Sequence, residues 1–155
     1  MKAVMAAVLA LGAGTAAAQA PAPYGTPITL EQAKRVGAAA EAEARRNTWN
    51  VAIAVVEPSG QLIWFQRIDG ANYAATQAAM DKARSAAGFR MSTRFWAVEG
   101  SKPGGAWVLG LNGAVPLEGG IPIVAGGRTI GGIGVSGVSS DDDAKVAQAG
   151  ANALR

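Results

Sequence analysis

Few residue types able to do chemistry occur in this sequence. It contains no histidine and no cysteine, so the commonest general base and the usual ligands of a zinc site are missing. A Ser-His-Asp or Cys-His nucleophile is therefore excluded. No phosphate-binding loop or dinucleotide fingerprint is present, and we interpret the glycines of residues 126–137 as close packing within a hairpin.

Two charged segments could still act on a ligand. In Asp81–Arg84 (DKAR), Lys82 could hold an anion and Asp81 could orient it, although a solvated helix face with local ion pairs is the preferred interpretation. In Asp141–Asp143, three carboxylates could bind a hard cation. Successive residues of a helix cannot all face one ion, so we expect these carboxylates to stabilise a helix N-terminus, and no metal site is expected.

A third segment, Phe89–Thr93, has the mixed chemistry of a pocket wall. It combines an aromatic ring, a cation, a thioether and hydroxyls, which suits a ligand site. The glycine- and proline-rich residues 100–120 follow it, and an irregular stretch of that length in a small domain is often functional. Ordinary core packing with a helix cap at Ser92 or Thr93 is the alternative.

The beginning of the sequence has the order of a secretory signal. Lys2 supplies a charge, an uncharged apolar run follows, and Ala16–Ala18 places small residues where a signal peptidase reads them. The run is shorter than the roughly 20 residues of a membrane span. We therefore expect a signal peptide over residues 1–18, against the alternatives of an uncleaved anchor or a buried helix.

The expected cut before Gln19 leaves a flexible tether over residues 19–27 and one domain over residues 28–155. We expect the mature protein to be periplasmic or secreted, with no membrane attachment after cleavage. The net charge is +3, but the basic residues are scattered and no basic patch is interleaved with aromatic residues. Nucleic-acid binding is therefore not expected.

Helices and hairpins must position the candidate residues. Thr29 and Gln32 have the spacing of a capping box, which predicts a helix from there to about Arg46. Periodicity and turn residues predict, in order, strands over 49–56 and 62–68, a helix over 73–89, a short helix to Val98, strands over 121–124 and 129–138, and a helix opened by Ser139 and Ser140. This order implies an α+β fold, with an antiparallel sheet flanked by helices.

Six stretches occur in the order typical of one family: Leu30–Ala33, Val51–Gly60, Asp81–Phe89, Gly119–Val124, Ile130–Gly137 and Asp143–Gly150. Together they make the domain resemble the GlcG/HbpS-like haem-binding family, which also occurs as the C-terminal domain of certain corrinoid adenosyltransferases. The resemblance implies a profilin-like fold, a central antiparallel sheet with helices around it. It also implies homo-oligomers and, in some members, haem or corrinoid-related ligands.

Haem is therefore the expected cofactor, although this chain lacks the histidine by which some members coordinate it. Another type of member is thought to use a threonine, and Thr93 is the matching position. The expected cofactor-binding residues are Phe89, Arg90, Met91, Thr93 and Lys82. Arg90 or Arg94 would pair with the propionates, and a thioether of Met80 or Met91 is the alternative axial ligand.

Two classes of function stay open. The first is an exported homo-oligomer, a dimer or larger, that binds haem or a related tetrapyrrole. Trp96 and Trp107 are expected to find no place in so small a core, which predicts an interface. The second is an enzyme or accessory protein acting on a small oxygenated metabolite, by association with glycolate and diol utilisation. It would recruit Tyr73, Asp81, Lys82 or Glu118, and a buried Lys82 in a pocket or a carboxylate of perturbed pKa would favour it.

Overall fold

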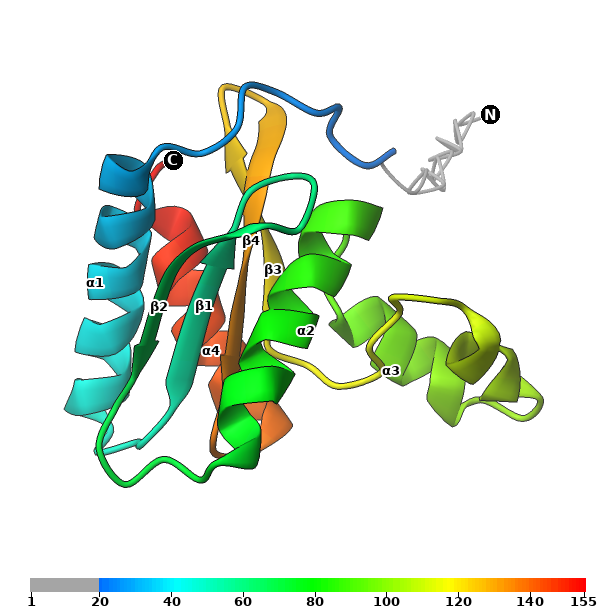
Figure 1. Cartoon of the computed structure of the whole chain (residues 1–155). Coiled ribbons are helices and arrows are strands. Elements are labelled where there is room, and N and C mark those ends of the chain that lie inside the picture. The colour runs from blue at the N-terminus through cyan, green and yellow to red at the C-terminus, as the bar shows by residue number, and fades with distance from the viewer. Residues whose placement is uncertain (1–19) are drawn as a thin grey trace, which may run out of the picture.

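The computed structural model describes residues 20–155, so the predicted signal peptide lies outside the described residues (Figure 1). The elements in order are α1 (Leu30–Arg46), β1 (Ala52–Val56), β2 (Leu62–Arg67), α2 (Ala74–Phe89), α3 (Arg94–Ser101), the 3-10 helix η1 (Gly105–Gly110), β3 (Gly120–Ala125), β4 (Arg128–Ser136) and α4 (Ser140–Asn152). Within this part of the chain, no helix combines the length and the apolar character needed to cross a bilayer.

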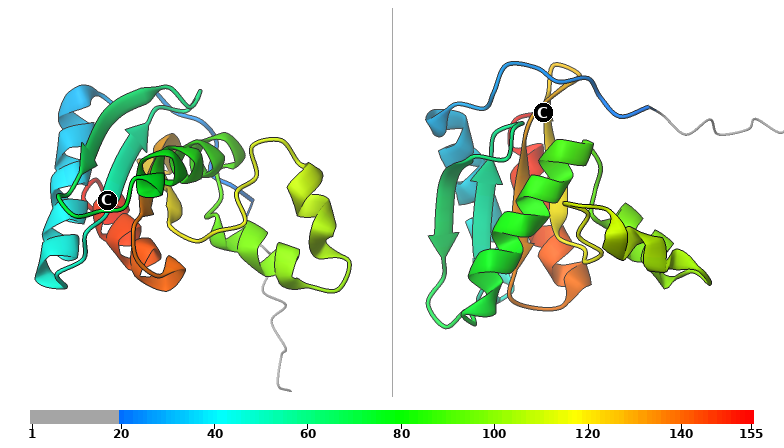
Figure 2. Two further views of the ribbon diagram at one scale, coloured as in Figure 1. Left: turned by 60° about the horizontal axis from the view of Figure 1, so that its bottom comes forward. Right: turned by 45° about the vertical axis from the view of Figure 1, so that its right-hand side comes forward.

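The four strands form one sheet in the order β2-β1-β4-β3, and each neighbouring pair is antiparallel. Helices α1 and α4 cover one face and α2 lies on the other (Figures 1 and 2). Two apolar clusters fill these layers, the larger beneath α1 and α4 and the smaller beneath α2. The predicted α+β fold with a central antiparallel sheet is confirmed.

The capping box predicted at the start of α1 is present. The Thr29 hydroxyl accepts from the backbone N–H of Gln32 at 3.2 Å, and the Gln32 side chain accepts from the backbone N–H of Thr29 at 3.0 Å. These bonds satisfy N–H groups that a helix start leaves without partners. The helix then ends at Arg46, as predicted.

Helix α2 lies directly on the backbone of β4. A Cβ atom added to Gly134 would overlap the carbonyl oxygen of Ala79, and one added to Gly132 would lie 2.5 Å from the carbonyl oxygen of Ala83. Glycine inside a strand marks such a close approach. The predicted close packing is therefore present, but at Gly132 and Gly134 its partner is helix α2 and not the other strand of the hairpin, and it fixes the height of α2 above the sheet.

Residues 94–117, which we call the arm, project from the body of the molecule (Figures 1 and 2). They contain α3 and η1, so the stretch predicted to be irregular holds a 3-10 helix. The base of the arm is fastened by two bonds. The Thr93 N–H donates to the carbonyl oxygen of Gly120 at 3.0 Å, and the Gly120 N–H donates to the Thr93 hydroxyl at 2.9 Å.

The prediction of a flexible tether over residues 19–27 is corrected for residues 22–27, which make hydrogen bonds to the domain. Gly25 N–H donates to the carbonyl oxygen of Thr129 at 2.9 Å, and Thr129 N–H donates to that of Pro23 at 2.8 Å. The Tyr24 hydroxyl donates to the carbonyl oxygen of Gly88 at 2.6 Å. Residues 22–27 are therefore held against β4 and the end of α2, because their backbone groups and one aromatic ring find partners there.

Candidate functional site

Lys82, in the middle of α2, is buried, with 2% of its surface exposed. Its ammonium donates to a carboxylate oxygen of Asp143 at 2.8 Å and to the carbonyl oxygen of Val135 at 2.9 Å. Gly119 leaves room for it, since a Cβ atom there would lie 3.1 Å from the Lys82 nitrogen. The expectation of a solvated helix face is therefore wrong for Lys82, while Asp81 and Arg84 do form a local ion pair at 3.3 Å.

Asp143, in the first turn of α4, is equally buried. Burial raises the pKa of its carboxyl group, while the Lys82 ammonium and the backbone N–H groups of Gly137 and Val138 oppose that rise. The pair is therefore a satisfied, desolvated contact between α2 and α4. The sequence held one signal for it, because Asp143 shares a helix face with Val146 and Ala147, both buried.

The helix cap predicted at the start of α4 is present. Ser139 caps α4 by accepting from the N–H of Asp142 at 3.2 Å. The Asp142 carboxylate pairs with Lys145 at 2.7 Å, and this cation lowers the pKa of Asp142. Among residues 20–155 there is no group of three acidic, histidine or cysteine residues arranged to hold a metal ion.

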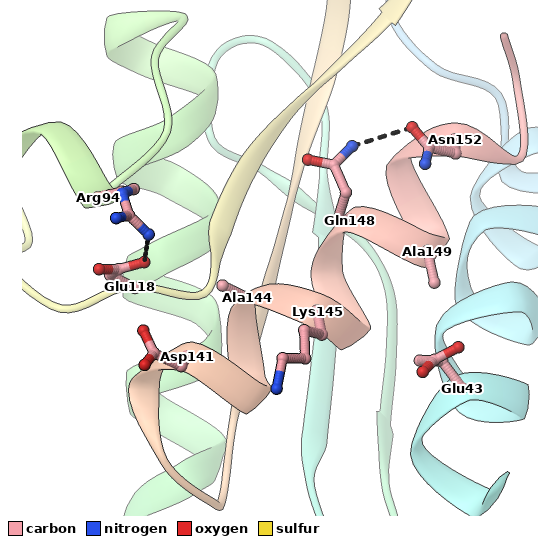
Figure 3. A pocket seen from close by; sticks show the side chains of 9 residues that line it. All are labelled: Glu43, Arg94, Glu118, Asp141, Ala144, Lys145, Gln148, Ala149 and Asn152. Carbon is pink, nitrogen blue, oxygen red and sulfur yellow. Dashed lines mark hydrogen bonds and ion pairs between the residues drawn. The ribbon is translucent and has the colours of Figure 1, made fainter. Parts of the chain in front are cut away.

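A polar groove of about 690 Å³ runs over α4 beside this acidic run (Figure 3). Arg94 and Glu118 form an ion pair at 3.2 Å at one end of the groove, where Asp141 also lies. The residues lining the groove are Glu43, Arg94, Glu118, Asp141, Ala144, Lys145, Gln148, Ala149 and Asn152. Its walls are mostly charged or amide side chains, which suit a small polar molecule.

The Phe89–Thr93 segment forms the junction between α2 and the arm. Arg90 ends α2 in the left-handed conformation, with φ 55°. The turn brings Phe89 edge-on to Trp96, with ring centroids 4.8 Å apart. Trp96 also lies edge-on to Trp107, and the centroids of these two rings are 6.3 Å apart. Trp96 is buried, with 5% exposed, so the expectation that it has no place in the core is wrong, whereas Trp107 is 53% exposed.

The structure brings together three of the five predicted cofactor-binding residues. Phe89, Arg90 and Met91 lie half-buried at this junction. Lys82 and Thr93 lie below the surface, where Lys82 pairs with Asp143 and the Thr93 hydroxyl accepts from Gly120. Ser92, not Thr93, supplies a hydroxyl at the start of α3, by accepting from the N–H of Arg94 at 3.2 Å.

The guanidinium of Arg90 is already engaged. It donates to the carbonyl oxygen of Ala22 at 3.3 Å and lies over the Tyr24 ring, 4.8 Å from the centroid. The Arg94 side chain is 66% exposed despite its pair with Glu118. Of the two arginines at this junction, Arg94 is therefore the one whose side chain is more accessible to a new anion.

Comparisons with known proteins give consistent results. A family model described as "Haem degrading protein HbpS-like" matches residues 28–152. Protein GlcG of Escherichia coli K12 is 35% identical over 109 residues, which are 70% of this chain and 81% of GlcG. The crystal structure of a double mutant of Streptomyces reticuli HbpS is 32% identical and has a TM-score of 0.76, with 94% of this chain and 99% of that chain covered. The crystal structure of a PduOC complex with haem has a TM-score of 0.75 at 23% identity, with 84% of this chain and 96% of that chain covered, and supports the fold.

Proposed function

This chain belongs to the HbpS-like family, and from that premise we propose that it is an exported homo-oligomer that binds haem or a related tetrapyrrole. The observation that carries the proposal is the junction at which Phe89, Arg90 and Met91 lie half-buried beside an aromatic cluster. A protein of the same fold was crystallised as a complex with haem, which supports the choice of ligand. Export rests on the order of charge, apolar run and small residues in residues 1–18.

The residues of the junction fit two requirements of a haem site. The macrocycle needs apolar contact, which the Phe89 ring and the Met91 side chain supply. Its propionates need a cation, which the exposed Arg94 side chain supplies because its planar fork can pair with a carboxylate bidentately. When bound, haem would supply a redox-active iron, and the chain's own residues would hold the ring and exclude water from one face.

The burial and contacts of the candidate side chains support Met91 as the residue that would ligate the iron. The Thr93 oxygen is buried and accepts from Gly120. Met80 packs against the apolar cluster beneath α2. Met91 is half-buried at the junction and is therefore the residue that we propose would hold the iron. Because a thioether is a poorer ligand than imidazole for ferric iron, the expected affinity is micromolar, about −8 kcal/mol.

A haem titration followed by the Soret band tests this proposal. We expect saturable binding by the unaltered protein and at least about tenfold weaker binding, near 1.4 kcal/mol, by Met91→Leu. Met80→Leu is the matched control, since it makes the same chemical change beneath α2. Absence of a saturable Soret shift in the unaltered protein would refute haem binding, and equal binding by Met91→Leu would refute only the axial assignment.

A second candidate is an enzyme or accessory protein for a small oxygenated metabolite. The buried Lys82 and the raised pKa of Asp143 favour it, and the polar groove beside them could take such a molecule. The ion pair itself lines none of five hollows on the described part of the chain, and neither do Phe89, Arg90 and Met91 of the junction. Calorimetric titration with small hydroxy acids tests this candidate, and Lys145→Gln in the groove should abolish any heat of binding.

A further inference from the structure

The arm carries most of the large apolar side chains that the described part of the chain exposes. Of eleven such side chains in residues 20–155, six lie in the arm: Phe95, Val98, Trp107, Leu109, Leu111 and Leu117. Leu109 is 78% exposed and Trp107 is 53% exposed. The arm stands away from the sheet (Figures 1 and 2), so the body of the same chain does not cover them. Exposed apolar patches of this kind mark interaction sites.

The same arm also contains a hollow of about 530 Å³. Small or apolar residues make up most of its lining, which consists of Ala97, Gly100, Ser101, Lys102, Gly104, Gly105, Ala106, Leu109 and Pro116. Leu109 is therefore both a highly exposed side chain and a wall of this hollow, whose other walls are largely glycine and alanine. In a two-fold contact every contact occurs twice with the roles exchanged. One exposed side chain and one hollow on a single surface can thus form two equivalent contacts between two copies.

Charge also favours a second copy as the occupant. The arm contains one acidic residue, Glu99, and two basic residues, Arg94 and Lys102. Lys102 pairs with Glu99 at 2.5 Å, and Arg94 pairs with Glu118, just beyond the arm, at 3.2 Å. Each charge of the arm is therefore paired with an opposite charge, so two identical arms can approach with little repulsion. An anionic membrane surface or a nucleic acid is bound through clusters of unpaired Lys and Arg, whereas the two basic residues of the arm are each paired with a carboxylate.

We propose that two copies of this chain join arm to arm about a two-fold axis, with Leu109 of each copy in the hollow of the other. This assignment rests on the proposed self-association and is independent of haem binding. It predicts that the apolar residues of the arm, and not the edge of the sheet, determine the assembly. If the complete assembly is larger than a dimer, this contact is one of its interfaces.

Sedimentation velocity at tens of micromolar tests the assignment on the purified protein. We expect a dimer or larger species for the unaltered chain, and at least about hundredfold weaker association for Leu109→Asp, since burying an unpaired carboxylate costs several kcal/mol. Tyr73→Asp is the matched control, because Tyr73 is 87% exposed outside the arm, and it should leave the assembly unchanged. A circular-dichroism melt of each variant shows that the fold is retained.

The outcomes separate the two proposals. A monomeric unaltered chain would refute self-association and the arm contact together. An oligomer that persists in Leu109→Asp would refute the arm contact alone.

A cross-linking experiment avoids dependence on a disruptive variant. The chain has no cysteine, so a single introduced thiol reports one position. We expect a short bis-maleimide to join two copies of Leu109→Cys and not two copies of Leu62→Cys, whose side chain is 43% exposed on the edge strand β2. Equal cross-linking of both variants, or none for Leu109→Cys in an oligomeric sample, would overturn the assignment.

Discussion

Lys82 and Asp143 form an ion pair, 2.8 Å long, that joins the middle of α2 to the first turn of α4 past the end of β4. Each side chain is 3% exposed. Two of the stretches on which the family resemblance rests, residues 81–89 and 143–150, meet at this contact. It holds together elements on opposite faces of the sheet, so its removal should be felt by the whole domain.

Removing one partner of the Lys82–Asp143 pair should lower the free energy of unfolding far more than replacing both partners by apolar residues. Asp143→Asn leaves the Lys82 charge buried without its counter-ion, so we expect the free energy of unfolding to fall by about 3–5 kcal/mol. The double variant Lys82→Met, Asp143→Leu should recover most of that loss, because apolar residues of similar volume need no counter-ion. Urea unfolding measures each value.

The exposed pair Asp81–Arg84 supplies the control for this cycle. Its side chains are 43% and 45% exposed, and an exposed ion pair contributes about 0–1 kcal/mol. Asp81→Asn should therefore change the free energy of unfolding by less than about 1 kcal/mol. Equal losses for Asp81→Asn and Asp143→Asn would show that the buried pair has no special structural weight.

Glu41 gives the fold a pH-dependent contribution. A hydrogen bond from Gln66 and the neighbouring Arg45 lower the pKa of Glu41 from its ordinary value of 4.5. A lowered folded-state pKa contributes stability that is fully present above the unfolded value and is lost as the pH falls through the folded value. We expect Glu41→Gln to reduce the free energy of unfolding at neutral pH by up to about 1 kcal/mol.

The pH series itself provides the check on Glu41. Below the folded pKa of Glu41, the carboxyl group is neutral in both states, so Glu41→Gln and the unaltered protein should become equally stable. Asp143 acts in the opposite direction, because its raised pKa favours the protonated folded state. If the free energies of unfolding of Glu41→Gln and of the unaltered protein differ by the same amount at every pH, the effect does not come from ionisation of Glu41.

Replacing a glycine by alanine should destabilise the fold where the glycine is tightly packed and stabilise it where the glycine is not. Gly134→Ala should lower the free energy of unfolding by about 3 kcal/mol or more, because its Cβ would overlap backbone atoms of Ala79 and Ala83 that cannot move independently of α2. Gly88, near the end of α2, has no atom within 4 Å of an added Cβ. Gly88→Ala should instead stabilise by about 0.5–1 kcal/mol. Thermal unfolding of the two variants measures both effects. If Gly134→Ala were as stable as the unaltered protein, the close packing of α2 on β4 would be contradicted.

The elements set by local signals could be predicted from the sequence. The Thr29–Gln32 capping box and the apolar periodicity fix both ends of α1, because both depend on residues within a few positions of each other. The fold class followed from the order of such elements. Residues 100–120 were harder, because their glycines and prolines suppress any period, and the 3-10 helix η1 within them depends on packing against α3.

The contacts of the candidate site could not be predicted in this way, because they join residues distant in the sequence. Lys82 and Asp143 are separated by 61 positions, and neither residue type alone indicates burial. Thr93 was a candidate helix cap or axial ligand, yet its hydroxyl accepts from Gly120, 27 positions away. Tyr24 similarly meets the end of α2, 64 positions away, which a pattern rich in proline and alanine does not reveal.

Export predicts a defined mature N-terminus. Expressed in a host with a secretory pathway, the protein should begin at Gln19, since Ala16 and Ala18 occupy the positions that a signal peptidase reads. Intact-mass spectrometry of the periplasmic fraction measures this. The double variant Ala16→Leu, Ala18→Leu should retain residues 1–18, and recovery of the unaltered protein with Met1 still present would count against export.

Thr93 separates a structural role from a role in ligand binding. Thr93→Val keeps the side-chain shape but leaves the buried N–H of Gly120 without an acceptor, which should lower the free energy of unfolding by about 1–3 kcal/mol. Thr93→Ser retains the hydroxyl and should keep the bond at the cost of one buried methyl group, about 1 kcal/mol. Because the Thr93 oxygen is buried within the chain, both variants, once folded, should bind haem within about twofold of the unaltered protein, a difference near 0.4 kcal/mol. Urea unfolding and Soret titration of the two variants give the two measurements independently. Loss of haem binding in Thr93→Val with retention in Thr93→Ser, at temperatures where both are folded, would identify the hydroxyl as an iron ligand and displace Met91 from that role.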